Sequence, residues 1–97
     1  MITVTVKGVA NFADLLGTRE PQEIAVPQGT TLRGLLAILI EEYGERLAAR
    51  IFTAESGELR KDFRPLLNGR DLYFLNGLDT ELKDGDRFTL MPFLAGG

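Results

Sequence analysis

Apolar and polar side chains alternate over residues 2–7, where isoleucine and valine take every second position and threonine and lysine take the others. A period of two is typical of a strand with one buried face. A second alternating segment at residues 23–26 runs into the turn signal Pro27-Gln28-Gly29. We therefore expect these two strands to form an antiparallel hairpin, with residues 8–20 as a long loop between them.

The next segment changes to the period of a helix. Its apolar residues recur at i, i+3, i+4, i+7, i+8 and i+11, and they are Leu32, Leu35, Leu36, Leu39, Ile40 and Tyr43. Thr30 or Thr31 can cap the start of this segment, and Gly44 follows it where a helix commonly stops. The pattern predicts one amphipathic helix whose apolar stripe belongs to the core.

The second half of the chain has weaker patterns. Residues 45–52 favour a second short helix, residues 65–67 a short strand, and residues 87–91 a final strand. A turn at residues 84–86 leads into that final strand, and Pro92 closes it. Four apolar residues are expected to anchor the irregular stretch between the strands to the core: Leu72, Phe74, Leu78 and Leu82.

The order strand, strand, helix, strand, strand predicts an α+β fold. We expect a mixed sheet of four to five strands with one main amphipathic helix across one face. A right-handed crossover through the helix lets the last strand pair parallel to the first. The predicted organisation is one domain over residues 1–92 and a flexible C-terminal tail over residues 93–97.

Composition narrows the chemistry available to this chain. Its 97 residues include no Cys and no His, which removes disulfides, thiolate nucleophiles, imidazole bases and the usual zinc sites. The net charge is −3 and the two signs are interleaved, which argues against nucleic-acid binding. The longest apolar run has six residues, at 35–40, whereas a membrane span needs about 20. We expect a cytoplasmic protein that is not an enzyme and binds no cofactor.

Acidic residues near the last turn raise the alternative of a metal site, and they are Asp79, Glu81, Asp84 and Asp86. Their spacing does not match the ligand positions of an EF-hand loop. Acidic residues at turns are usually solvated, so the sequence predicts no metal site here.

The chain ends in Phe93-Leu94-Ala95-Gly96-Gly97. Consecutive glycines have the lowest steric profile and the widest backbone freedom, which suits a tail that passes through a narrow channel. A terminal carboxylate on Gly97 is ionised near neutral pH and can attack a phosphate. The simplest alternative is that Gly96 and Gly97 form a frayed end without function.

Residues 82–97 resemble the end of the MoaD/ThiS family of ubiquitin-like sulfur carriers. The family pattern is a Leu-x-Asp-Gly-Asp turn, an apolar strand, a proline, and a terminal Ala/Ser-Gly-Gly. Residues 67–72, 75–80 and 27–32 are also similar to longer members, so the resemblance covers nearly the whole chain and is strongest to the molybdopterin-synthase small-subunit-like branch. It implies the β-grasp (ubiquitin-like) fold.

The resemblance also implies a reaction cycle. An E1-like enzyme would use ATP to adenylate Gly97, with Gly96 supplying tail flexibility. A cysteine desulfurase or rhodanese-type donor would then convert Gly97 to a thiocarboxylate. A biosynthetic enzyme, such as the large subunit of molybdopterin synthase, would accept the sulfur. Open alternatives are a carrier for cysteine, thiamine or tRNA thiolation, a ubiquitin-like modifier joined through Gly97 to lysines, and a β-grasp interaction module with an inert tail.

Apolar residues beyond the final strand are candidates for contact with a partner. We expect Phe93, Leu94 and Ala95 to line a partner's groove, with Phe74 and Phe63 extending the patch. The alternative is that Phe93 and Leu94 fold back over the sheet edge. Phe93 also stands where the small subunit of molybdopterin synthase has a second proline, which leaves the sulfur-accepting pathway open.

Overall fold

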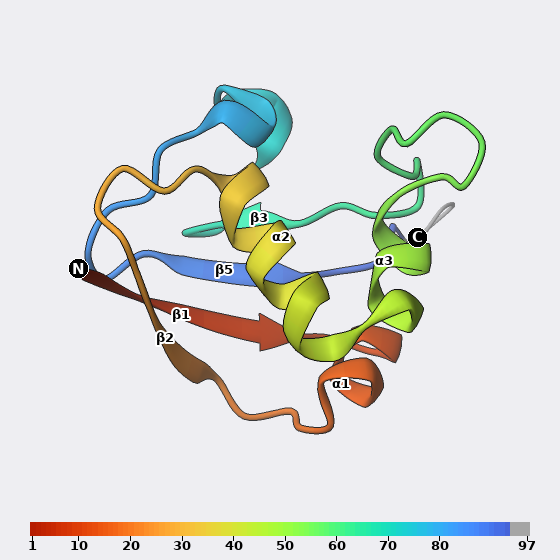
Figure 1. Ribbon diagram of the computed structural model, residues 1–97, viewed down its shortest axis with the longest axis horizontal. Helices are drawn as coiled ribbons and strands as arrows, with labels where there is room; N and C mark the ends of the chain where they lie inside the picture. The colour runs from red at the N-terminus through yellow and green to blue at the C-terminus, as the bar shows by residue number, and fades with distance from the viewer. Residues whose placement is uncertain (94–97) are drawn as a thin grey trace.

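The computed structural model describes residues 1–93, except for the side chain of Tyr73. Within this range, five strands form one mixed sheet in the order β2-β1-β5-β3-β4 (Figure 1). The strands are β1 (Ile2–Gly8), β2 (Gln22–Val26), β3 (Leu66–Leu67), β4 (Arg70–Asp71) and β5 (Arg87–Leu90). The two central strands, β1 and β5, are parallel, and the other pairs are antiparallel. The predicted hairpin, the mixed sheet and the parallel terminal strand are confirmed.

The main helix is α2 (Leu32–Tyr43), which crosses one face of the sheet (Figure 1). The Thr31 hydroxyl caps it by accepting a hydrogen bond from the Gly34 backbone N–H at 3.3 Å. At its other end, Gly44 has a φ of 87° and separates α2 from the predicted second helix, α3 (Glu45–Ile51). The helical stripe predicted from the sequence is therefore present, with its four leucines buried.

The segment predicted as a long loop contains a short helix, α1 (Asn11–Leu16), so that prediction was wrong. Phe12, Ala13 and Leu16 are buried on one side of this helix. Gly8 allows its close approach, because a Cβ at Gly8 would lie 2.7 Å from the backbone carbonyl carbon of Phe12. Six residues contain too few helical turns for a clear apolar period.

The core lies between the sheet and α2. Its largest fully buried side chains are Phe12, Phe88, Leu32, Leu35, Leu36, Leu39, Leu47, Ile51, Leu90, Val4, Val6 and Val26. In β5 the buried Phe88 and Leu90 alternate with outward-facing residues, so the last strand is anchored in the middle of the domain. No helix within residues 1–93 is long and apolar enough to cross a membrane.

The predicted irregular stretch contains two short 3-10 helices, η1 (Leu72–Phe74) and η2 (Gly77–Asp79). Leu72 and Leu82 are buried and Leu78 packs against the core, as predicted. Phe74 is 80% exposed, so its prediction as a core anchor was wrong. It ends a helix of three residues, which is too short to bury side chains on more than one side.

Candidate functional site

The turn that leads into β5 is held by its acidic side chains. The Asp84 carboxylate accepts a hydrogen bond from the Thr3 backbone N–H at 2.8 Å. The Asp86 carboxylate accepts one from the Lys83 backbone N–H at 2.8 Å and one from the Asn68 side-chain amide at 2.9 Å. These carboxylates fix the start of the last strand, and residues 1–93 contain no group of acidic side chains placed to hold a metal ion.

The chain remains paired after β5 ends. The Arg64 backbone N–H donates to the Met91 carbonyl at 2.9 Å, and the Phe93 backbone N–H donates to the Asp62 carbonyl at 2.7 Å. Phe63 and Pro92 form an antiparallel bridge between these two hydrogen bonds. We call residues 62–64 and 91–93 the tail root, because together they fix the place where the predicted tail begins.

Phe93 is the last described residue and lies at the surface, with half of its area exposed. The guanidinium carbon of Arg64 is 5.3 Å from the centroid of the Phe93 ring, within the range of a cation–π interaction. The Nε atom of the same guanidinium is 3.2 Å from a carboxylate oxygen of Asp71. Phe93 therefore contacts its own domain on one side and remains accessible on the other.

A second ion pair, between Arg60 and Asp62, stabilises residues 62–64 of the tail root. Nε and Nη2 of Arg60 donate to the two carboxylate oxygens of Asp62 at 2.9 and 3.0 Å. These hydrogen bonds, together with the positive charges of Arg60 and Arg50, hold the pKa of Asp62 below its ordinary value. The hydrogen bonds to Asp62 and its negative charge in turn raise the pKa of Arg60. Both charges therefore persist near neutral pH beside the start of the tail.

The other predicted site residues have different outcomes. Leu94, Ala95, Gly96 and Gly97 lie outside the described residues, so their predicted roles stay predictions. Phe63 is only 3% exposed and its ring packs against Phe12 with centroids 5.3 Å apart, so its prediction as part of an exposed patch was wrong. Side chains alternate along this extended segment. The neighbours of Phe63 in the chain, Asp62 and Arg64, lie on the outward side, so Phe63 lies on the inward side.

Phe74 is exposed as a partner-binding residue should be, but it is not near the tail root. It belongs to η1, which Figure 1 shows at the top of the molecule, whereas the described chain ends at the right, beside α3. The exposed aromatic side chains of Phe74 and Phe93 therefore do not form one patch.

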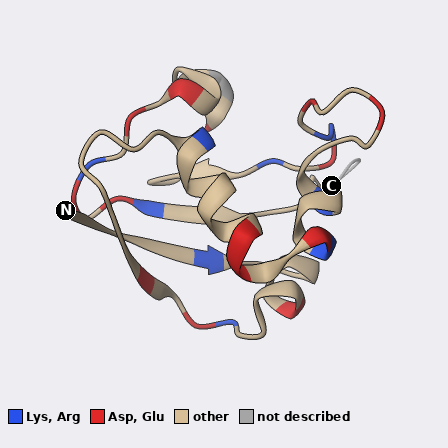
Figure 2. Cartoon of the chain, in the orientation of Figure 1, with Lys and Arg blue, Asp and Glu red and all other residues tan. Residues whose placement is uncertain are grey.

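Sequence reasoning missed the segment that pairs with the end of β5. The only local signals in residues 60–64 are one apolar residue, Phe63, among charged residues, and the proline that follows. Figure 2 shows acidic segments near the end of the described chain and, among them, the basic residues of this segment and of α3. These basic residues bring positive charge to one end of a molecule whose net charge is −3.

Comparisons with known proteins agree with the resemblance found in the sequence. The model of the ThiS family matches residues 7–97. Small archaeal modifier protein 3 of Haloferax volcanii is 38% identical over 88 residues, covering 91% of each chain. A putative sulfur carrier protein of Archaeoglobus fulgidus is 33% identical over 67 residues, covering 69% of this chain and 74% of the relative.

A solved structure extends the comparison to the whole fold. The putative molybdopterin converting factor, subunit 1, of Pyrococcus furiosus superposes with a TM-score of 0.76 at 29% identity, covering 97% of this chain and all of the other. The predicted β-grasp fold is thereby confirmed. The chain belongs to the ThiS family of small ubiquitin-like sulfur carriers and modifiers.

Proposed function

We propose that this protein carries sulfur as a thiocarboxylate on Gly97 and that a partner enzyme activates the Gly97 carboxylate. The observation that carries the proposal is the match to the ThiS family, which extends through residue 97. The tail root supports it, because Asp62 and Arg64 hold the chain in one place up to the half-exposed Phe93. A partner can then find the point where the four following residues begin at a fixed position on the domain.

The proposed chemistry needs no catalytic group from this chain. An oxygen of the Gly97 carboxylate attacks the α-phosphorus of ATP, and pyrophosphate leaves. The terminal sulfur of a persulfide on a cysteine desulfurase or rhodanese-type donor then attacks the acyl carbon and displaces AMP, which gives an acyl disulfide between Gly97 and the donor. A thiol then attacks the donor-side sulfur, forms a disulfide with the donor and releases the Gly97 thiocarboxylate. The absence of Cys and His from the chain is compatible with this role. ATP is bound by the E1-like partner, and we propose that the cycle runs in the cytoplasm.

We propose molybdopterin synthesis as the pathway that accepts the sulfur, with the large subunit of a molybdopterin synthase as the final partner. The similarity to a putative subunit of the molybdopterin converting factor supports this choice. Phe93, Leu94 and Ala95, which precede the two glycines in the chain, would line that partner's groove.

Conjugation to proteins is a second candidate, because the relative with 38% identity is a small archaeal modifier. The same acyl-adenylate serves both functions. In the modifier, the amine of a target lysine finally takes the acyl group and forms an isopeptide bond, and no sulfur remains on the product.

Mass spectrometry of the protein purified from its native host tests both candidates. A carrier gives an intact mass increased by the replacement of one oxygen by sulfur, located on the C-terminal peptide. A modifier gives Gly-Gly remnants on lysines of other proteins after proteolysis. If neither product forms and deletion of Gly96 and Gly97 leaves growth unchanged, the proposed function is wrong.

A reconstituted reaction tests the role of Gly97 directly. The full chain and its E1-like enzyme should exchange pyrophosphate into ATP, whereas a chain with one alanine added after Gly97 should not. The added residue displaces the carboxylate from the nucleotide but leaves the domain intact, so both chains should unfold at the same urea concentration. Unfolding of the extended chain at lower urea would show instead that the tail is structural.

A further inference from the structure

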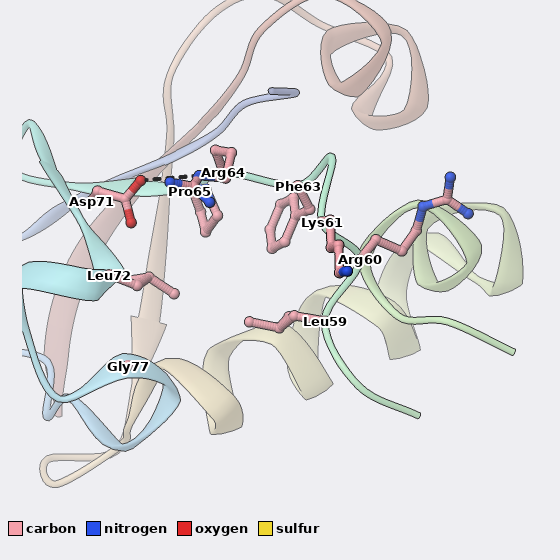
Figure 3. Close-up of a pocket in the computed structure, with 9 residues that line it drawn as sticks. All are labelled: Leu59, Arg60, Lys61, Phe63, Arg64, Pro65, Asp71, Leu72 and Gly77. Atoms are coloured by element: carbon pink, nitrogen blue, oxygen red, sulfur yellow. Dashed lines mark ion pairs between the residues drawn. The ribbon is translucent and has the colours of Figure 1, made fainter. Parts of the chain in front are cut away.

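A small pocket lies beside the tail root, on the side of the 59–65 segment that faces α2. Figure 3 shows Leu59 and Leu72 pointing toward each other across it, with the Phe63 ring above them and η2 below. Pro65 completes the apolar wall. Leu59 is partly exposed, so the pocket opens to the surface.

The size of the pocket restricts what it can hold. Its volume is about 150 Å³. Sites for drug-sized molecules and cofactors usually occupy roughly 300–1,000 Å³, so this one suits a single side chain. An apolar wall around a space of this size favours one bulky apolar side chain as its occupant.

Basic residues surround the mouth of this pocket. Arg60, Lys61 and Arg64 line it, and Asp71 is the one carboxylate among its described lining residues. Arg60 extends away from the pocket toward α3 (Figure 3). There it lines a second, shallower hollow together with Arg46 and Arg50.

We call Arg46, Arg50, Arg60, Lys61 and Arg64 the basic cluster. Arg60 is paired with Asp62, and Arg64 is paired with Asp71. Within residues 1–93, no ion pair is formed by the other three cations. Counted with the two carboxylates that pair with them, the five cations of the basic cluster sum to +3, although the whole chain carries −3.

The basic cluster and the pocket share residues with the tail root. Arg64 lines the pocket and also contacts the Phe93 ring. Asp62, which pairs with Arg60, accepts the hydrogen bond from the Phe93 backbone. An enzyme that takes up the residues after Phe93 must therefore come close to this surface.

We propose that the pocket and the basic cluster bind an acidic segment of the activating enzyme, in which carboxylates flank one bulky apolar side chain. The apolar side chain enters between Leu59 and Leu72, and the carboxylates face Lys61 and the arginines. This docking holds the enzyme while the tail reaches its nucleotide. The inference rests on the proposed function, since it requires that an enzyme activates Gly97.

Charge reversal at Lys61 tests the charged part of the interface. Lys61 is exposed and outside the core, so Lys61→Glu should fold normally. We expect it to raise the KM for this protein in pyrophosphate exchange about tenfold with kcat unchanged, because repulsion replaces attraction at the interface. Raising the salt concentration should reduce the difference.

Lys83→Glu is the matched control. It makes the same change in net charge at another exposed lysine, which lies in the turn before β5, at the opposite end of that strand from the tail root. Its KM should stay within about twofold of the wild-type value, because the charge lies outside the proposed interface.

Leu59→Trp tests the apolar part without a change of charge. The larger side chain should fill the pocket and raise KM, whereas Leu59→Met, which conserves the volume, should have a smaller effect. Thermal unfolding checks that both variants fold. If Leu59→Trp does not fold, Arg46→Glu tests the interface as a second charge-reversal variant.

The outcomes separate the two proposals. If the wild-type chain is not adenylated at all, the proposed function fails. If it is adenylated but Lys61→Glu, Arg46→Glu and the folded pocket variant keep the wild-type KM, the docking inference is overturned while the proposed function stands. Light scattering adds a further check: a wild-type dimer that Lys61→Glu dissociates would mean that a second copy occupies this surface, and the inference would again be overturned.

Discussion

Arg64 contacts three other residues of the molecule. Its backbone N–H pairs with Met91, its guanidinium lies over Phe93, and its Nε contacts Asp71. Arg64→Met keeps the backbone bond and much of the apolar stem but removes the charge. We expect the free energy of unfolding to fall by about 1 kcal/mol, because exposed cation–π contacts and ion pairs each contribute roughly 0.2–1 kcal/mol.

Urea unfolding measures this change, and Arg64→Lys is its control. Lysine keeps the charge but lacks the planar group that stacks on a ring, so its effect should be smaller. If Arg64→Met lowers the free energy of unfolding by more than about 3 kcal/mol, Arg64 stabilises the core and not only the tail root.

The carboxylate of Asp62 gives a pH-dependent prediction. Its folded-state pKa is lowered, first by the hydrogen bonds from Arg60. A group of this kind contributes stability above the pKa of the unfolded chain and loses it as the pH falls through the folded-state pKa. The Arg60–Asp62 pair should therefore stabilise the tail root at neutral pH and weaken only in acid, below the ordinary Asp pKa of 3.8.

NMR titration of the Asp62 carboxyl carbon checks this sign. Arg60→Gln should raise the Asp62 pKa toward 3.8, because the charge and the paired hydrogen bonds are lost. Arg33→Gln is the control, since Arg33 pairs with Asp79 instead. The accompanying change in stability should be small, because both partners are exposed to solvent. An Asp62 pKa that does not move in Arg60→Gln would contradict the assigned cause.

At the scale of elements, Gly44 decides how α2 passes into α3. Its φ of 87° and ψ of −170° lie in a region that only glycine adopts without strain. A Cβ at this position would meet nothing within 4 Å, so the cost of Gly44→Ala comes from the backbone and not from a clash. We expect it to lower the free energy of unfolding by about 1–3 kcal/mol in urea titrations.

Glu41→Ala is the control for this variant, because it places alanine at an exposed position of α2. Its effect should stay within about 0.5 kcal/mol. If Gly44→Ala has no larger effect, the two helices do not depend on the unusual backbone at Gly44.

The elements also show how far the sequence predicts this fold. Residues 2–7 and 32–43 repeat an apolar pattern over several periods, so β1 and α2 could be predicted from local sequence. The short strand predicted at residues 65–67 is present as β3, beside β5, whereas β4 was not predicted, because two residues that pair only with β3 carry no periodic pattern. The pairing of residues 62–64 with 91–93 is equally non-local. The tail was therefore predictable as a motif, whereas the residues that hold its root were not.

At the scale of the whole molecule, the position of β5 connects the core to the functional end. It lies between β1 and β3, with Phe88 and Leu90 buried, so its direction is fixed by the centre of the domain. The four residues after Phe93 can span at most about 14 Å when fully extended. An activating enzyme must therefore place its nucleotide within that distance of the tail root, and this limit is why contacts beside Phe93 can contribute to recognition.

C-terminal truncations test where the folded unit ends. Removal of residues 94–97 should change the free energy of unfolding by less than about 0.5 kcal/mol, because the predicted tail contributes no core. Removal of residues 92–97 should lower it by about 1–2 kcal/mol, since it also removes the Phe93–Asp62 hydrogen bond and the Arg64–Phe93 contact. Both truncations should abolish pyrophosphate exchange, which separates the loss of function from the loss of stability. Urea unfolding of the two chains gives the comparison, and equal destabilisation by both would mean that residues 94–97 belong to the folded domain.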